Sequence, residues 1–407
     1  MFMYLQNTIK RWLDSKRQDI SDRVRVEYRL LCSGELYNST GVYTDWRKSM
    51  PSRIILTNMA QLFVTSQPFD RYPQELAFTF DCYRTEDSAE RISVHYRPDE
   101  GVAEEFTDLL SLLARRLICV FRKIYEYQYD KEMLGGAPQY WPFPIHDTKS
   151  PKVWPRGHAT LIYDGKDRPR FESDMPPPVG VDVGKLKQFL KVFAALEETV
   201  VENFINATRL YKTALTFIED EPAIAYLQLI FCIETVANFA YRDFVPDKTT
   251  QIEAKRNVKD LATKYGLKIS QAQELALVAC KGIPWAKQKF IKFILDHTDD
   301  SLFRQDDTLF NLPTSMTPNK EDFEKSLAEI YRMRAKAGHE GQPFPPQVGM
   351  GRDGWISVFA VTQWYRDFQQ TGKGFVLPPA TWFERVVNLA LLTYIEKLTG
   401  VDKIAAV

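Results

Sequence analysis

The chain has few histidines and no paired cysteines, and these shortages exclude whole classes of site. Its 407 residues include five cysteines, none in a Cys-x-x-Cys pair, and five scattered histidines. A zinc site or a disulfide framework needs such residues at short, regular spacing. The sequence therefore predicts reduced, mostly buried thiols, no metal site and a cytoplasmic location.

An excess of charge is also missing, because lysine plus arginine and aspartate plus glutamate number 53 each. Zero net charge argues against a protein that wraps long nucleic acid by bulk electrostatics, although a small basic site is allowed. The chain start lacks an apolar stretch with a small-residue cleavage site, so we expect no signal peptide.

Long apolar runs are rare as well. The most apolar one, AIAYLQLIFCIETVANFAY, is interrupted by Gln228, Glu234 and Asn238. It is too short and too polar to span a bilayer comfortably, which predicts a buried helix of a soluble core and no membrane partner.

Motifs of several enzyme classes are absent from the sequence. It contains no G-x-x-x-x-G-K-[ST], no strand-linked G-x-G-x-x-G, no H-E-x-x-H and no G-x-S-x-G. One segment imitates a magnesium nuclease, with Pro246-Asp247 before Glu253-Ala254-Lys255. Its surroundings, TTQIEAKRNVKDLATKYG, predict a helix with Thr249 or Thr250 as its cap and solvated charges. We therefore expect neither a metal nor a cofactor.

Residues 1–134 combine strand and helix patterns and predict an α+β domain, with an antiparallel sheet backed by a helix. A first amphipathic helix is expected over 1–18 and a stronger one over 103–133. Stretches rich in β-branched and aromatic residues predict strands at 22–34, 52–58, 75–84 and 91–97. In the first of these, apolar and charged residues alternate from Val24 to Leu30, as in a strand with one solvent-exposed face.

The rest of the chain divides near residue 182. Residues 135–182 are rich in Pro, Gly and Trp and predict an irregular connector. Residues 183–407 predict an all-α bundle. Its expected helices are 183–217, 221–243, 249–264, 270–281, 284–297, 320–338, 355–369 and 379–399. At this length, each of the two domains is large enough to bury its own core.

The segment YRMRAKAGHEG, from Tyr331 to Gly341, carries the residues with the clearest chemical use. Arginine binds phosphate through a planar fork of donors, and histidine transfers protons near neutral pH. The same residues also suit an ordinary helix end, because cations meet the negative end of the helix dipole and glycine stops the helix. The pattern alone does not choose between these two interpretations.

The wider context resembles the HEPN superfamily, in particular its ApeA-like branch. An apolar helix over Ala225–Ala237 with Glu234 precedes a later helix with Tyr331, Arg334 and His339. The resemblance covers roughly residues 185–400. It implies a HEPN-like helical domain and a metal-independent endoribonuclease, often a toxin, an anti-phage defence effector or an RNA-processing factor. It also implies a homodimer that shares its site.

The resemblance implies that Arg334 and His339 are the catalytic pair, acting on RNA such as tRNA. His339 would take the proton of a ribose 2′-hydroxyl as it attacks the phosphate, giving a 2′,3′-cyclic phosphate. Supporting roles are expected for Glu234, Asn238, Tyr331, Arg332 and Lys336. Of these, Glu234 is expected to orient Arg334, because a carboxylate on an apolar helix face needs a partner.

Helix geometry limits how the pair can act. Five residues apart on an unbroken helix, Arg334 and His339 point about 140° away from each other. They converge if the helix loosens near Gly338 or if two protomers join their helix ends. Arg332, seven residues before His339, shares its face and competes for the phosphate-binding role.

Two residues depart from the family pattern and support an alternative. Ala335 follows the motif arginine where a polar residue is often found, and Glu340 follows His339 in place of glycine. The alternative is a non-catalytic HEPN module that binds nucleic acid or a protein partner. In either case the N-terminal domain is a candidate sensor of a trigger or a restraint on the helical domain.

Overall fold

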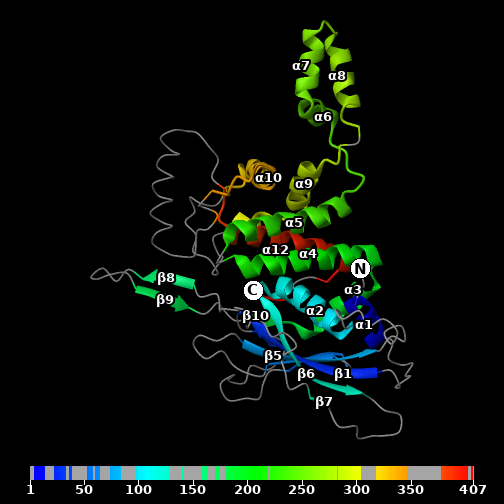
Figure 1. Ribbon diagram of the computed structural model, residues 1–407, viewed down its shortest axis with the longest axis vertical. Coiled ribbons are helices and arrows are strands. Elements are labelled where there is room, and N and C mark those ends of the chain that lie inside the picture. The colour runs from blue at the N-terminus through cyan, green and yellow to red at the C-terminus, as the bar shows by residue number, and fades with distance from the viewer. Residues whose placement is uncertain are drawn as a thin grey trace.

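A computed structural model of the chain combines an antiparallel sheet with a larger set of helices (Figure 1). The structure describes residues 4–13, 23–33, 36–38, 53–57, 60–64, 74–83, 98–128, 139–140, 158–162, 170–174, 179–218, 221–281, 283–303, 318–345, 348, 377–401 and 405–406. The predicted strand at 91–97 and the predicted helix at 355–369 lie outside these residues.

Among the described residues, the main sheet has six strands in the order β3-β4-β5-β1-β6-β7, and every neighbouring pair is antiparallel. The strands are β1 (Arg23–Cys32), β3 (Arg53–Thr57), β4 (Ala60–Val64), β5 (Gln74–Tyr83), β6 (Ile118–Gln128) and β7 (Gln139–Tyr140). Three of the four predicted strands are therefore confirmed as β1, β3 and β5. On β1 the alternation is confirmed at Val26, Tyr28 and Leu30, which are all buried.

The predicted helix over 103–133 is wrong in its second half. Helix α2 covers Pro98–Ala114, and the chain then turns at Arg115, whose φ is 47°, into strand β6. The segment ICVFRKIYEYQ is rich in β-branched and aromatic residues, which pack well in a sheet. Pairing with β1 along its whole length decides the outcome, because an apolar run of this kind fits either structure.

Helices α1 (Tyr4–Leu13) and α2 pack together against the sheet. Phe106 of α2 stacks on Phe78 of β5 with 4.2 Å between ring centroids. A Cβ atom at Gly101 would lie 2.2 Å from the ring of Tyr4, so glycine is what lets the two helices approach. The amide of Leu5 donates to Glu105 Oε2 at 2.7 Å.

The segment predicted to be an irregular connector contains short strands. Strands β8 (His158–Ile162) and β9 (Arg170–Asp174) form an antiparallel hairpin. Strand β10 (Val179–Val181) pairs in parallel with β2 (Leu36–Asn38) and antiparallel with β11 (Ala405–Ala406). This small sheet places segments from both ends of the chain next to the start of the helical region.

Apart from 355–369, which lies outside the described residues, the helices predicted after residue 183 are present with small changes. They are α3 (Val183–Ala195), α4 (Glu198–Phe217), α5 (Pro222–Ala240), α6 (Lys248–Ala254), α7 (Arg256–Lys264), α8 (Ile269–Val278), α9 (Ala286–His297), α10 (Phe323–Glu340) and α12 (Ala380–Thr399). The predicted helices 183–217 and 249–264 are each divided in two, near Leu196 and at Lys255. A short 3₁₀ helix, Asp300–Phe303, follows α9.

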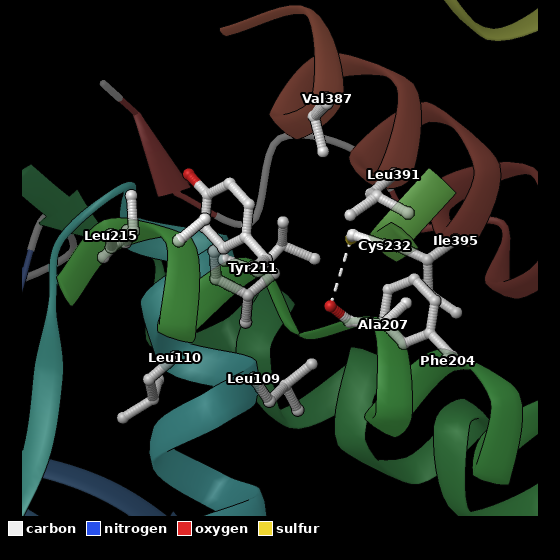
Figure 2. Close-up of a cluster of buried hydrophobic side chains, with 14 of the residues drawn as sticks. Leu109, Leu110, Phe204, Ala207, Tyr211, Leu215, Cys232, Val387, Leu391 and Ile395 are labelled. Carbon is white, nitrogen blue, oxygen red and sulfur yellow. Dashed lines mark hydrogen bonds between the residues drawn. The ribbon is translucent and has the colours of Figure 1, made fainter. Parts of the chain in front are cut away.

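The helices lie in layers above the sheet, with α2 lowest, α4 and α12 next, then α5, and α9 and α10 beyond it (Figure 1). One cluster of buried apolar residues runs through all of these layers. Among the described residues, the sheet region and the helical region thus share this buried cluster. Figure 2 shows part of this cluster, where α2, α4, α5 and α12 meet and the Cys232 thiol donates to the Ala207 carbonyl at 3.1 Å.

Helix α5 lies inside this core, as the sequence predicts. By length and composition it is the one described helix that could cross a membrane, so the expectation that it is too short and too polar to do so is wrong. Its buried residues include Tyr226, Leu229, Ile233 and Val236, which pack among the neighbouring helices. Its apolar composition is therefore explained by packing in the bundle. The thiols of Cys32, Cys232 and Cys280 are buried as well, in agreement with the prediction for the cysteines.

A buried set of polar side chains joins the sheet-backing helix α2 to the bundle. Arg115 donates to the Glu384 carboxylate from Nε at 3.3 Å and from Nη2 at 2.8 Å. The Tyr211 hydroxyl donates to the same carboxylate. Asn388 donates to the Leu112 carbonyl at 2.8 Å and to the Tyr211 oxygen at 3.2 Å. Because Glu384 is fully buried, this charge is tolerated through these donors.

Removing the Glu384 carboxylate should therefore destabilise the whole chain. We expect Glu384→Ala to lower the free energy of unfolding by about 3–5 kcal/mol, because it leaves the Arg115 charge buried without its main partner. Urea unfolding of the parent and the variant measures this loss. As a matched control, Asp243→Ala removes an exposed ion pair with Arg242 and should change the value by less than about 0.5 kcal/mol. Equal effects would contradict the assigned role.

Glu105 should give the fold a measurable pH dependence. Burial raises the pKa of its carboxyl from 4.5 to about 7, although the Leu5 amide bound to it acts in the opposite direction. The native state thus keeps a proton that the unfolded chain releases, so the free energy of unfolding falls as the pH rises from 4.5 through 7.

We expect Glu105→Gln to remove this contribution while retaining an acceptor for the Leu5 amide. The difference in free energy of unfolding between variant and parent should grow by up to about 3 kcal/mol from pH 4.5 to pH 8, in favour of the variant. Urea unfolding at a series of pH values tests this. A constant difference across the range would show that Glu105 does not titrate in this way.

Candidate functional site

Helix α10 carries the arginines and the histidine singled out in the sequence. One stripe of the helix is buried against the neighbouring helices: Phe323, Ser326, Leu327, Ile330 and Met333. This spacing is that of an amphipathic helix and leaves the opposite face in solvent. The helix ends at Gly341, where φ is 65° and the amide donates to the Lys336 carbonyl.

The helix is longer than the sequence predicts. Gly338 lies inside it, and the helix continues to Glu340 before Gly341 ends it. Arg334 and His339 therefore stand on one unbroken helix and point about 140° apart. Of the two routes by which the pair converges, the loosened helix is not observed, and within a single chain the two side chains do not meet.

Arg334 is held between helices α10 and α5. Its Nη2 atom donates to Glu234 Oε2 at 3.0 Å, and the Tyr331 hydroxyl donates to Glu234 Oε1 at 2.6 Å. The guanidinium lies over the ring of Phe231, 5.3 Å from its centroid, and 5.8 Å from that of Tyr331. The expected contact between Glu234 and Arg334 is thus present, and it fixes the orientation of the guanidinium.

The exposure of these groups decides what they can contact. The Glu234 side chain is 11% exposed and that of Arg334 is 25% exposed, so the carboxylate faces inward and part of the guanidinium faces solvent. Burial, followed by the hydrogen bond to Glu234, raises the pKa of Tyr331 well above its usual value. Tyr331 therefore remains a donor at every physiological pH and supports Glu234, not the solvent.

His339 has a different environment. Its side chain is exposed in the last turn of α10. Arg332, seven residues earlier, shares its face of the helix and is also exposed. The Arg332 guanidinium is engaged by Glu329, one turn before it, through two hydrogen bonds. Within one chain, the arginine on the His339 face is therefore Arg332, which is held in a surface ion pair. Lys336, three residues before His339, is its other cationic neighbour on the helix.

The remaining predicted site residues lie around this helix end. Lys336 is half-buried, and its carbonyl receives the amides of Gly341 and Gln342. Asn238 is exposed one turn beyond Glu234 on α5 and takes no part in the hydrogen bonds of Glu234 and Arg334. Glu340 is exposed next to His339. The structure thus brings Glu234, Tyr331 and Arg334 together and leaves His339 outside that group.

Phe231 and Glu329 are the contacting residues that sequence reasoning missed. Phe231 precedes Glu234 by three residues, so helical spacing alone puts both on one side of α5. Glu329 precedes Arg332 by three residues, which is the usual spacing of a helical ion pair. Both signals were present in the sequence, but the contact of Phe231 with Arg334 depends on how α5 and α10 pack.

The segment that imitates a magnesium nuclease is helical, as predicted. Asp247 caps α6, where its carboxylate accepts from the Thr250 amide at 3.0 Å and the Thr250 hydroxyl at 2.9 Å. The predicted cap, Thr249 or Thr250, is therefore shifted by a few residues. In the part of the chain that the structure describes, no group of three or more His, Cys, Asp or Glu side chains has an arrangement suited to a metal ion.

Comparison with protein-family models, with curated proteins and with solved structures finds no match to this chain.

The ion pair of Glu234 and Arg334 should contribute to stability more than the one on the surface. We expect a double-mutant cycle with Glu234→Ala and Arg334→Ala to give a coupling energy of about 1–2 kcal/mol, since both groups are partly buried. The control cycle, Glu329→Ala with Arg332→Ala, should give about 0.3–0.5 kcal/mol. Urea unfolding of the six variants and the parent measures both. A smaller coupling for the inner pair would contradict this account.

Proposed function

We propose that the protein is a metal-independent endoribonuclease of HEPN type, acting as a homodimer in toxin or defence activity in the cytoplasm. The observation that carries the proposal is that Arg334 is fixed in place while His339, near the same end of α10, is exposed. Arg334 is oriented by Glu234 and Phe231, and the His339 imidazole is presented to solvent five residues later. A fixed cation and an accessible proton acceptor are the two groups that cleavage through a 2′-hydroxyl requires.

The proposed reaction divides its work between these two groups. His339 takes the proton of the ribose 2′-hydroxyl as that oxygen attacks the adjacent phosphorus. Arg334 donates to the phosphorane oxygens, where negative charge builds in the transition state. The bond to the 5′-oxygen breaks, and that oxygen takes a proton from solvent while the His339 imidazolium releases the one it accepted. The products are a 2′,3′-cyclic phosphate and a 5′-hydroxyl end. DNA lacks the attacking hydroxyl and is not a substrate.

The divergence of the two side chains implies that a single chain holds an incomplete site. With α10 unbroken, one protomer's Arg334 and another protomer's His339 must meet across a two-fold interface of the helical domain. Two equivalent sites would then form per dimer. Arg332 and Lys336 flank the pair and are proposed to hold the RNA backbone, with Asn238 at the edge, whereas Tyr331 holds Glu234 in place.

The alternative is a non-catalytic HEPN module that binds nucleic acid or a protein partner. One observation favours it: Arg334 already links α5 to α10 through its ion pair with Glu234 and its contact with Phe231, which is a structural role. Ala335 and Glu340 favour the same alternative. The side chain of Ala335 cannot donate a hydrogen bond, and Glu340 adds a carboxylate beside His339. In both readings we propose that the N-terminal sheet region senses a trigger or restrains the helical domain.

The first test is cleavage of end-labelled tRNA and a mixed RNA ladder in EDTA. The parent should leave cyclic-phosphate ends, and His339→Ala should reduce the rate by about 10²–10⁴-fold. Arg334→Ala should also reduce the rate, while Arg332→Ala, on the same helix, should affect it much less. Equal cleavage by the parent and His339→Ala would show that His339 is not the catalytic base.

Mixing the two inactive variants tests whether the site is shared. If subunits exchange, an equal mixture of His339→Ala and Arg334→Ala should regain about a quarter of the parent activity, because half the dimers contain one intact site of two. No recovery, with exchange verified by differently tagged subunits, would place both groups in one chain. A folded dimer that binds RNA without cutting it would favour the binding module.

A further inference from the structure

Helices α7 and α8 form a hairpin that projects from the layered body at the far end from the sheet (Figure 1). The hairpin buries little: Ala262, Ala272, Ala276 and Cys280 are its buried residues. Its large apolar side chains are instead exposed to solvent. Of the ten that are exposed among the described residues, seven fall between residues 245 and 278.

Four of these side chains gather where α7 turns into α8, and we call them the apolar tip. They are Leu261, Tyr265, Leu267 and Ile269, with exposed fractions of 54%, 78%, 40% and 64%. Exposed apolar residues concentrated in one short segment point to an interaction surface, because surface leucines are normally scattered singly.

The turn under the apolar tip is well formed. Gly266 has a φ of 86°, which a residue with a side chain would adopt only with strain. The Leu267 amide donates to the Ala262 carbonyl at 3.1 Å, and the Lys268 amide donates to Gln271 Oε1 at 3.1 Å. Local hydrogen bonds thus end α7 and begin α8. The apolar side chains are presented by a defined turn.

The charge around the apolar tip has one sign. From Leu261 to Gln273 the sequence contains Lys264 and Lys268 and no acidic residue. Both lysines are exposed. The nearest acidic residue of α7, Asp260, is paired with Arg256 at 3.6 Å. A ligand for this surface must therefore offer an apolar phase and negative charge together.

Three other occupants fit these observations less well. A second copy of the hairpin packed tip to tip about a two-fold axis would bring identical lysines together. An RNA strand would satisfy the lysines and stack on Tyr265, but it offers nothing to Leu261, Leu267 or Ile269. The tip projects from the body (Figure 1), whereas an acidic helix of another protein docks in a groove.

We propose that the apolar tip of the α7–α8 hairpin docks on an anionic lipid surface. Tyr265, Leu267, Ile269 and Leu261 enter the interfacial layer, and Lys264 and Lys268 remain level with the lipid phosphates. The predicted absence of a membrane partner was argued from the lack of a spanning segment, which does not bear on docking at the surface. This proposal stands independently of RNA cleavage.

Vesicle co-sedimentation of the full chain tests the proposal. The parent should bind vesicles containing 30% phosphatidylglycerol and not vesicles of phosphatidylcholine alone. The variant Lys264→Gln with Lys268→Gln should lower the partition coefficient about 30-fold, because each lysine near an anionic surface contributes about a factor of five. Tyr265→Ser with Ile269→Ser should lower it about 100-fold.

Matched controls separate docking from general adhesion. Lys187→Gln with Lys191→Gln removes two exposed lysines of α3, and Leu398→Ser removes an exposed leucine of α12, so neither should alter vesicle binding. Far-ultraviolet circular dichroism verifies that each variant is folded. His339→Ala should retain full vesicle binding, so failure of the nuclease proposal would leave this result unaffected.

Three outcomes would overturn the proposal. They are no binding of the parent to anionic vesicles, equal binding by the tip variants and the parent, and equal loss in the α3 control. If the tip variants instead lose RNA binding, or change a dimer to a monomer in sedimentation while no vesicle binding is seen, the occupant is RNA or a second copy.

Discussion

The buried carboxylate of Glu384 is the constraint on which the two parts of this protein depend. It stands on α12, receives Arg115 from the end of α2 and Tyr211 from α4, and is fully buried. A charge in such a place is stable only while all its donors are present. The sheet with its covering helix and the helical bundle are therefore coupled. A change in one part is expected to be felt in the other.

This coupling provides a physical basis for the proposal that the N-terminal sheet region controls the helical domain. Helix α2 packs on the sheet through Phe106 and on α4 through further buried polar contacts, including Lys212 with Asp108 at 2.6 Å. Helix α4 in turn packs on α5, which carries Glu234. A continuous packed route thus runs from the sheet to Arg334. The route is spatial, and energetic coupling along it requires an element with two arrangements.

Local signals in the sequence were enough for most elements. Alternation in β1, proline at the start of α5 and the apolar stripe of α10 each describe a structure that short-range sterics and burial largely dictate. These local signals gave a wrong prediction where one sequence pattern is compatible with two kinds of secondary structure. The run after Ala114 fits a helix as well as a strand, and its pairing with β1 made it β6. Gly338 permits a helix end, but Gly341 with its positive φ is the residue that ends it.

By itself, the sequence determined the composition of the candidate site and the expectation that Glu234 needs a partner. It fixed the five-residue spacing of Arg334 and His339, and hence their divergence on an intact helix. The tertiary structure decided that the helix is intact, that Phe231 and Tyr331 enclose the guanidinium, and that both parts share one core. These results depend on contacts between residues about a hundred positions apart, as between Glu234 and Arg334. Local propensity carries no information about such distant neighbours.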